Sequence, residues 1–238
     1  MNLNKHSMER RHFIRLGLTG ALGLIATTGD LLWQTQPARS EGVGSATQSL
    51  SPDAAMEKLL EGNQRFIQHQ PQYPDQSAVR LREVAQVQHP FATILSCADS
   101  RVAPEIVFDQ GIGDIFDIRI AGNIATPEAI GSIEYAAVLL GTPLVMVLGH
   151  ERCGAVTATV QQEPLPGDIS TFVQAIKPAL KKVNLQSSNA VEEAVVANVQ
   201  YQIERLKRSH LLTERVESGK LKIVGGRYDL DTGKVTII

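Results

Sequence analysis

Short apolar runs that alternate with amphipathic helical stretches are the strongest constraint on the fold of this chain. The apolar runs are rich in β-branched residues and span residues 91–95, 115–120, 144–148 and 221–224. Helical patterns lie between several of them, at residues 126–140, 169–182 and 191–208. This alternation predicts an α/β fold with a mostly parallel central sheet flanked by helices. Ligands of such sheets bind beyond the carboxyl ends of the strands.

Two further helices are predicted before the first strand. Ser51-Pro52-Asp53 provides an N-cap, a proline at the first helical position and an acid in the first turn, and a helical spacing continues to about Gln68. A second helix is predicted over residues 79–87. Neither helix has the apolar bulk to be stable alone. We therefore expect an N-terminal helical arm that packs on the main body or on a partner subunit.

The first forty residues have the pattern of an export signal. A basic start precedes an apolar stretch at residues 16–27 and the small-residue pattern Ala38-Arg39-Ser40. The apolar stretch is shorter than the roughly 20 residues that a membrane-spanning helix needs, so we expect cleavage after Ser40. A retained signal would instead leave the protein associated with the membrane.

The residues around Arg10 and Arg11, in Glu-Arg-Arg-His-Phe-Ile, resemble a twin-arginine signal. An ordinary secretory signal with adjacent arginines is the alternative. The resemblance implies the twin-arginine export machinery as a partner. The destination would be the periplasm or a thylakoid lumen.

After the first forty residues, the sequence predicts a linker and a single domain. Residues 41–50 are rich in Gly, Ser, Thr and Gln and are typical of a flexible linker, and residues 51–238 form a single predicted domain. The 238 residues carry a formal charge of -2. No Lys/Arg-rich block is present, so a nucleic-acid partner is not expected.

Two of the apolar runs lead into side chains that can bind a metal. The first precedes Cys97-Ala-Asp99-Ser-Arg101 and the other precedes His150-Glu-Arg-Cys153. Both cysteines and the histidine should therefore lie at the same end of the sheet. Two thiolates and an imidazole are suitable ligands for Zn²⁺, and three protein ligands leave a fourth position open for catalysis. From the residues alone, a buried thiol pair or a Cys97–Cys153 disulfide remains an equal alternative.

The sequence around these residues resembles the β-class carbonic anhydrases. The resemblance is dense from about Gln88 to Val160 and looser from Ser51 to the C-terminus. It is carried by Cys97-Ala-Asp-Ser-Arg, residues 111–123, residues 131–135, Gly149-His-Glu-Arg-Cys-Gly-Ala and Gly225-Gly-Arg-Tyr-Asp. It implies the reversible hydration of CO₂ to bicarbonate and a proton, by attack of zinc hydroxide on CO₂. The implied zinc ligands are Cys97, His150 and Cys153.

The same resemblance implies catalytic roles for Asp99 and Arg101. Asp99, held by Arg101, would accept a hydrogen bond from the hydroxide and orient it. Gln88 matches a glutamine that reaches the substrate across a dimer interface in members whose site is always open, so we predict an open site. Because the family builds its site at that interface, a homodimer or a dimer of dimers is expected.

Four more positions match residues that bind substrate in the family. Phe116, Ala121 and Tyr135 match the lining of a small apolar pocket, and Gly154 matches a glycine that offers its backbone amide. An apolar pocket suits CO₂, which has no charge and no hydrogen-bond donor. The chain departs from the family at Ile120, where members commonly have Asn or Thr.

Two other functions remain open from sequence. The same zinc site could hydrolyse carbonyl sulfide or carbon disulfide, and access to the pocket would decide between these substrates and CO₂. A noncatalytic zinc or thiol redox protein would contain a Cys97–Cys153 disulfide or a fourth protein ligand. The Asp99 and Arg101 pair argues against this second alternative.

Overall fold

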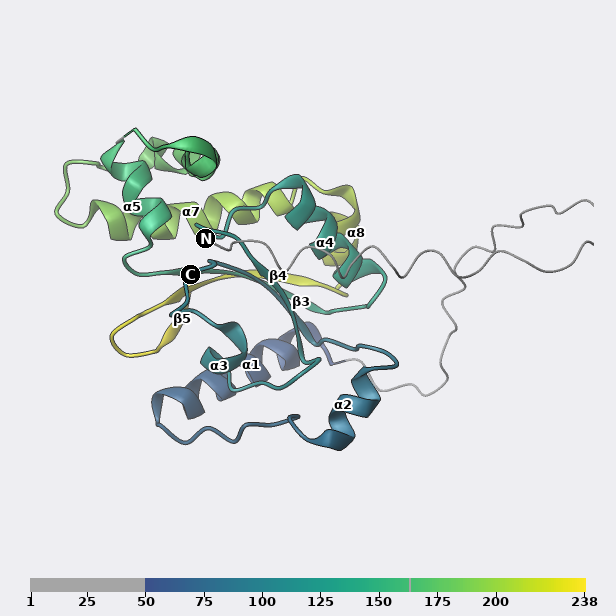
Figure 1. The fold of residues 1–238 in the computed structure, drawn as a ribbon. Coiled ribbons are helices and arrows are strands. Elements are labelled where there is room, and N and C mark those ends of the chain that lie inside the picture. Colours follow the sequence, from purple (N-terminus) through teal and green to yellow (C-terminus); the bar gives the residue numbers. More distant parts are fainter. Residues whose placement is uncertain (1–49, 163) are drawn as a thin grey trace, which may run out of the picture. The chain divides into compact units, whose positions relative to one another are not determined.

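The central feature of the protein is a five-stranded sheet between two layers of helices (Figure 1). The computed structural model describes residues 50–162 and 164–238. The strand order is β2-β1-β3-β4-β5, and only β5 is antiparallel to its neighbour. The strands are β1 (Ala92–Ser96), β2 (Ile115–Arg119), β3 (Leu144–His150), β4 (Lys222–Tyr228) and β5 (Val235–Ile237). The predicted α/β fold with a mostly parallel sheet is therefore confirmed.

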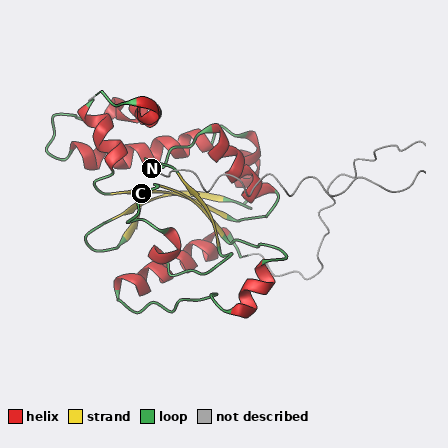
Figure 2. Ribbon diagram, in the orientation of Figure 1, coloured by secondary structure: helices red, strands yellow, loops and turns green. Residues whose placement is uncertain are grey.

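Alternate side chains of the strands enter two different apolar clusters. In β3, Leu144, Met146 and Leu148 face one side of the sheet, whereas Val145 and Val147 face the other. The first side is covered by α1 (Pro52–Ile67) and α3 (Pro104–Val107). The second is covered by α4 (Pro127–Val138), α7 (Ala190–Leu206) and α8 (His210–Glu217) (Figure 2). Because both faces are covered, β3 is buried along its whole length.

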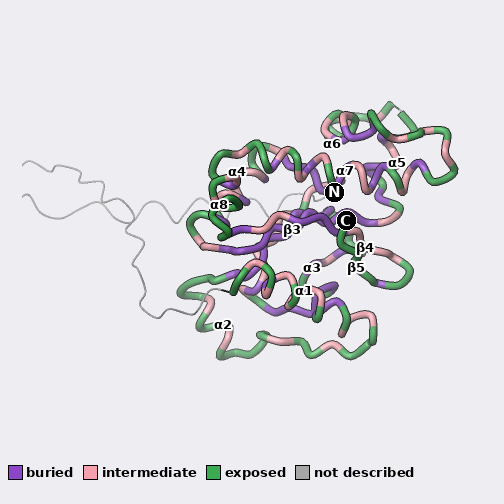
Figure 3. Tube along the Cα trace, turned by 180° about the vertical axis from the view of Figure 1, so that it is seen from behind, coloured by how far each residue is buried: buried purple, intermediate pink, exposed green. Residues whose placement is uncertain are grey.

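The two helices of the predicted N-terminal arm differ in burial. Helix α1 starts after the Ser51 N-cap as expected, and its Ala55 and Leu59 are fully buried against the sheet. It is therefore part of the core of the domain. Helix α2 (Ala78–Val84) ends three residues earlier than predicted and has no buried residue (Figure 3).

Several helices differ from the sequence pattern. Residues 169–182 were predicted as one helix, but α6 (Ser170–Ile176) passes into the 3-10 helix η2 (Lys177–Lys182). Pro178 lies at this junction and has no backbone N–H to continue an α-helix. Helices α3, α5 (Gly154–Gln161) and α8, with the short 3-10 helix η1 (Gly167–Ile169), were not predicted.

The predicted export signal lies outside the described residues, as does the predicted linker apart from Leu50. Within residues 50–162 and 164–238, no helix is both long and apolar enough to cross a membrane.

The order of the strands places a switch point between β1 and β3. The chain passes from β1 outward to β2 on one side, and from β3 outward to β4 on the other. In open α/β sheets, ligands bind at the carboxyl ends of the strands beside such a point. Cys97 follows β1 directly and His150 ends β3, so both lie there.

On the edge strand β2, the Asp117 carboxyl has a pKa raised to about 7. Burial is the main cause, the nearby Glu105 carboxylate adds to it, and Arg119 opposes it. The Oδ1 atom of Asp117 is buried without a hydrogen-bond partner. Ionised Asp117 therefore destabilises the folded protein.

We expect Asp117→Asn to stabilise the protein at about pH 8.5 by about 1–2 kcal/mol, a discounted value because solvent partly reaches the group. The folded pKa of about 7 exceeds the ordinary value of 3.8, so between these values only the folded state holds the proton. Wild-type stability should fall as pH rises through this window, and the advantage of the variant should vanish near pH 4. Urea unfolding of both proteins at about pH 8.5 and about pH 4 measures the difference in their free energies of unfolding. An equal stabilisation at both pH values would contradict this explanation.

Candidate metal centre

Three buried side chains converge at the carboxyl ends of β1 and β3. Potential ligand atoms of Cys97, His150 and Cys153 all lie within 4.8 Å of one another. His150 is the last residue of β3, and Cys153 is the N-cap of α5. Between them, Arg152 adopts a left-handed conformation with φ of 50°, which reverses the chain into α5. Two strands, the start of one helix and one tight turn therefore hold the three donors together.

The orientation of the His150 ring identifies its available nitrogen. Nδ1 lies 2.8 Å from the backbone carbonyl oxygen of Glu151. Because a carbonyl can only accept, Nδ1 carries the proton and Nε2 keeps its lone pair. Nε2 is buried and has no hydrogen-bond partner within the described residues. A buried lone pair next to two sulfurs is the arrangement that a bound metal ion would satisfy.

The two cysteines are both buried, and they are not joined in a disulfide. The pKa of Cys97 is lowered to about 4, chiefly by a hydrogen bond from the Cys153 thiol and to a lesser degree by the Gly122 N–H, whereas burial opposes this shift. The same shared proton raises the pKa of Cys153, and burial adds to that rise. A divalent cation can replace this proton, because it stabilises both thiolates together.

Asp99 lies beside the three donors and is held by Arg101. The Arg101 side chain donates to the two carboxylate oxygens of Asp99 at 3.0 and 2.7 Å, and its backbone N–H donates at 2.9 Å. These bonds from Arg101 are the main reason that the pKa of Asp99 is lowered to about 2. Asp99 Oδ2 lies 3.9 Å from His150 Nε2. The carboxylate is therefore ionised and close to the cluster, but it is not one of the three clustered donors.

Arg119 supports this loop, a role that sequence reasoning did not assign to it. Its side chain donates to the backbone carbonyls of Cys97 at 3.2 Å and Asp99 at 2.6 Å. The only sequence signal was its position in the family-like segment. Next to it, Ile120 packs among apolar side chains on two sides.

The five predicted substrate residues do not all lie at the cluster. Ala121 packs in the same apolar group as Cys97 and Cys153, and the exposed Gly154 directly follows Cys153. Gln88 is exposed and precedes β1, so it lies toward the amino ends of the strands, opposite the donors.

Phe116 and Tyr135 form a separate pair within the chain. Phe116 is in register with Thr93, four residues before Cys97, which is roughly 13 Å along a strand. The Phe116 and Tyr135 rings lie 6.2 Å apart, and Tyr135 is 45% exposed. Neither ring belongs to the apolar group that packs around Cys97 and Cys153.

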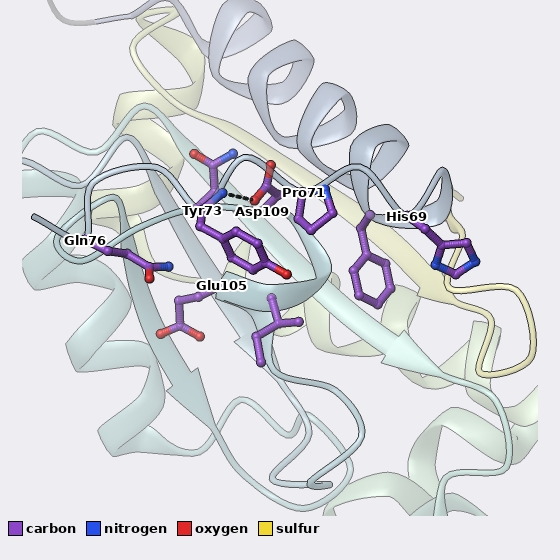
Figure 4. Close-up of a pocket in the computed structure, with 9 residues that line it drawn as sticks. His69, Pro71, Tyr73, Gln76, Glu105 and Asp109 are labelled. Carbon is purple, nitrogen blue, oxygen red and sulfur yellow. Dashed lines mark hydrogen bonds between the residues drawn. The ribbon is translucent and has the colours of Figure 1, made fainter.

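A separate cavity of about 360 Å³ lies between the end of α1 and α3 (Figure 4). Its wall is fixed by Asp109, whose carboxylate accepts hydrogen bonds from the backbone N–H groups of Gln72 and Tyr73 and from Arg65. None of the clustered donors lines this cavity.

The fold and motifs match known proteins. A family model described as carbonic anhydrase matches residues 92–235. The solved structure of "the beta-carbonic anhydrase CcaA" aligns with a TM-score of 0.63 and 28% identity, over 76% of this chain and 86% of that one. This chain belongs to the β-carbonic anhydrase family. The recognition of the family from its motifs is thus confirmed.

Other relatives agree with this family membership. "Carbonic anhydrase 2" of Mycobacterium tuberculosis is 41% identical over 192 residues, which are 79% of this chain and 93% of that protein. One of the "two tetrameric beta-carbonic anhydrases" of Sordaria macrospora aligns with a TM-score of 0.62, over 77% of this chain and 96% of that one. At 20% identity, the likeness to this Sordaria macrospora structure supports the fold alone.

Proposed function

We propose that this protein is a zinc enzyme that catalyses the reversible hydration of CO₂ to bicarbonate and a proton. The observation that carries the proposal is the cluster of Cys97, His150 and Cys153, with the Asp99–Arg101 pair beside it. Family membership and the name of the 41% identical relative support the same activity.

The donor set fits zinc. Two sulfurs and one imidazole nitrogen are typical of catalytic zinc sites, and the unpartnered Nε2 of His150 supplies the nitrogen. When bound, zinc would lower the pKa of water to near 7, which provides hydroxide for attack on CO₂. Burial of the donors keeps competing water away from them.

Asp99 would act as a hydrogen-bond acceptor in an open site. Its lowered pKa keeps it ionised, and both of its oxygens are held by Arg101, so its carboxylate is fixed outside the donor cluster. From this position it can accept a hydrogen bond from a hydroxyl group that lies beside the three donors. The backbone N–H of Gly154, the first residue of α5, can orient a bicarbonate oxygen.

A second copy of the chain would complete the substrate pocket. Phe116, Tyr135 and Gln88 are candidate substrate residues that lie away from the donors of their own chain. The exposed part of Tyr135 can therefore meet the site of a partner. The expected assembly is a homodimer or a dimer of dimers, in line with the tetrameric relative from Sordaria macrospora.

Stopped-flow CO₂ hydration on the zinc-loaded protein from residue 41 tests the function. We expect a rate well above that of buffer at mildly alkaline pH. A protein with one zinc per chain and no activity above buffer would exclude the proposal. Carbonyl sulfide and carbon disulfide serve as comparison substrates in the same assay.

Replacing Asp99 with Asn is expected to lower kcat by about 30-fold, or about 2 kcal/mol. The change keeps the size of the side chain but removes a charged acceptor and its pairing with Arg101. Zinc content, measured by atomic absorption, should stay at the wild-type level. Loss of zinc from the variant would instead assign Asp99 to metal binding.

We further propose that the twin-arginine machinery exports this protein. Changing both Arg10 and Arg11 to Lys should keep the full-length precursor in the cytoplasm. Cell fractionation with an antibody measures this outcome. Export of the double variant at the wild-type rate would favour an ordinary secretory signal.

A further inference from the structure

The Cys97 sulfur receives a hydrogen bond from a tightly constrained turn. Gly122 N–H donates to Cys97 Sγ at 3.3 Å. Gly122 has a φ of +74°, and the Asn123 N–H donates to the Ile120 carbonyl at 2.8 Å, which closes a β-turn with glycine at its third position. A Cβ atom at Gly122 would lie 2.6 Å from Ile176 Cδ1. The turn is therefore packed closely above the sulfur and leaves little room for adjustment.

Two buried amide side chains of α7 form hydrogen bonds to the backbone of this turn. Ala125 N–H donates to Gln202 Oε1 at 2.9 Å, and because a backbone N–H can only donate, this bond fixes the orientation of the Gln202 amide. Gln202 Nε2 then donates to Asn198 Oδ1 at 2.9 Å. That bond leaves Asn198 Nδ2 to donate to the Gly122 carbonyl at 2.9 Å. In this series of hydrogen bonds from Ala125 to Gly122, every donor is therefore paired with an acceptor.

Both amides are completely buried, at 0% exposure. Burying two amide groups is costly unless their hydrogen bonds are made, and apolar residues would fill a helix core at lower cost. Asn198 and Gln202 are one helical turn apart on α7, so both point toward the same side. Their bonds go to the loop that contacts Cys97 and not to another core element.

We infer that Asn198 and Gln202 are positioning residues for the metal thiolate, because they hold the 120–125 turn so that the Gly122 N–H stays on Cys97 Sγ. This inference rests on the proposed zinc site. The N–H group stabilises negative charge on the sulfur and fixes its direction. Outer-sphere hydrogen bonds of this kind change metal affinity and the charge that a thiolate donates to the metal.

The test compares Asn198→Leu and Gln202→Met with Asn63→Leu in the full-length chain. Asn63 is another buried asparagine, and it hydrogen-bonds to backbone groups on the opposite face of the sheet. Zinc affinity is measured by competition with a chelator. The charge-transfer absorption of the Co²⁺-substituted protein reports the Co–thiolate bonds directly. Far-UV circular dichroism shows whether each variant is folded.

We expect both α7 variants to bind zinc about 10- to 100-fold more weakly than wild type and to shift the Co²⁺–thiolate band. Asn63→Leu should leave the affinity and the band unchanged. Wild-type zinc affinity and an unshifted band in folded Asn198→Leu would overturn the inference. So would failure of both α7 variants to fold where Asn63→Leu folds, because the amides would then serve the fold. Failure of wild type to bind zinc would instead overturn the proposed function.

Discussion

Changing Cys153 to Ser is expected to remove zinc from the purified protein and to lower CO₂ hydration at least about 1,000-fold, or about 4 kcal/mol. Among the residues that the structure describes, Cys153 is one of three donors in this cluster, and the Asp99 carboxylate is bound to Arg101 and does not replace it. A serine hydroxyl is a poor ligand for zinc compared with a thiolate. Metal analysis after gel filtration and stopped-flow assays measure the two effects.

The matched control for this change is Ala158→Ser, which adds a hydroxyl to the same helix α5 without touching a donor. Zinc content and activity should remain near wild type in the control. If Cys153→Ser kept one zinc per chain and its activity, the proposed ligand set would be wrong.

The periodicity of the sequence was enough to predict the sheet. In β3, each apolar residue is buried because helices cover both faces, and continuous apolar runs of this kind are what a parallel sheet requires. The carboxyl ends of β1 and β3 could also be predicted, because the apolar runs stop just before Cys97 and His150. Since parallel strands share their carboxyl ends, the sequence predicted that the three donors lie at the same end of the sheet, whereas the neighbouring positions of β1 and β3 came from the structure.

Other parts of the site depend on contacts that have no local pattern. Asn198 and Gln202 lie more than 70 positions from the turn that they hold, and within α7 they look like ordinary polar residues. Helix α5 was missed because it starts at a glycine, a poor helix former, and its cap is a cysteine. Distant hydrogen bonds of this type are fixed only when the sheet has brought the segments together.

Asn63 on α1 also makes contacts with segments that are distant in the sequence. Its amide nitrogen donates to the carbonyls of Val107 at 3.0 Å and Gly233 at 2.8 Å, and its oxygen accepts from the Val235 N–H at 2.8 Å. The residue is only 4% exposed. One side chain therefore joins α1, α3 and the β4–β5 hairpin, which are far apart in the sequence.

Asn63→Leu should lower the free energy of unfolding by about 3 kcal/mol, because three backbone groups lose their partners in a buried position and the added apolar contact offsets only part of that cost. For a domain of this size, the melting temperature should fall by roughly 6–12 °C. Urea unfolding and thermal melts measure the change, with Gln64→Leu on the exposed side of the same helix as the control. A loss below about 1 kcal/mol would mean that the hairpin and α3 are held by apolar packing alone. Because Asn63 lies on the α1 face of the sheet and not among the donors, zinc content should be unchanged in the folded variant.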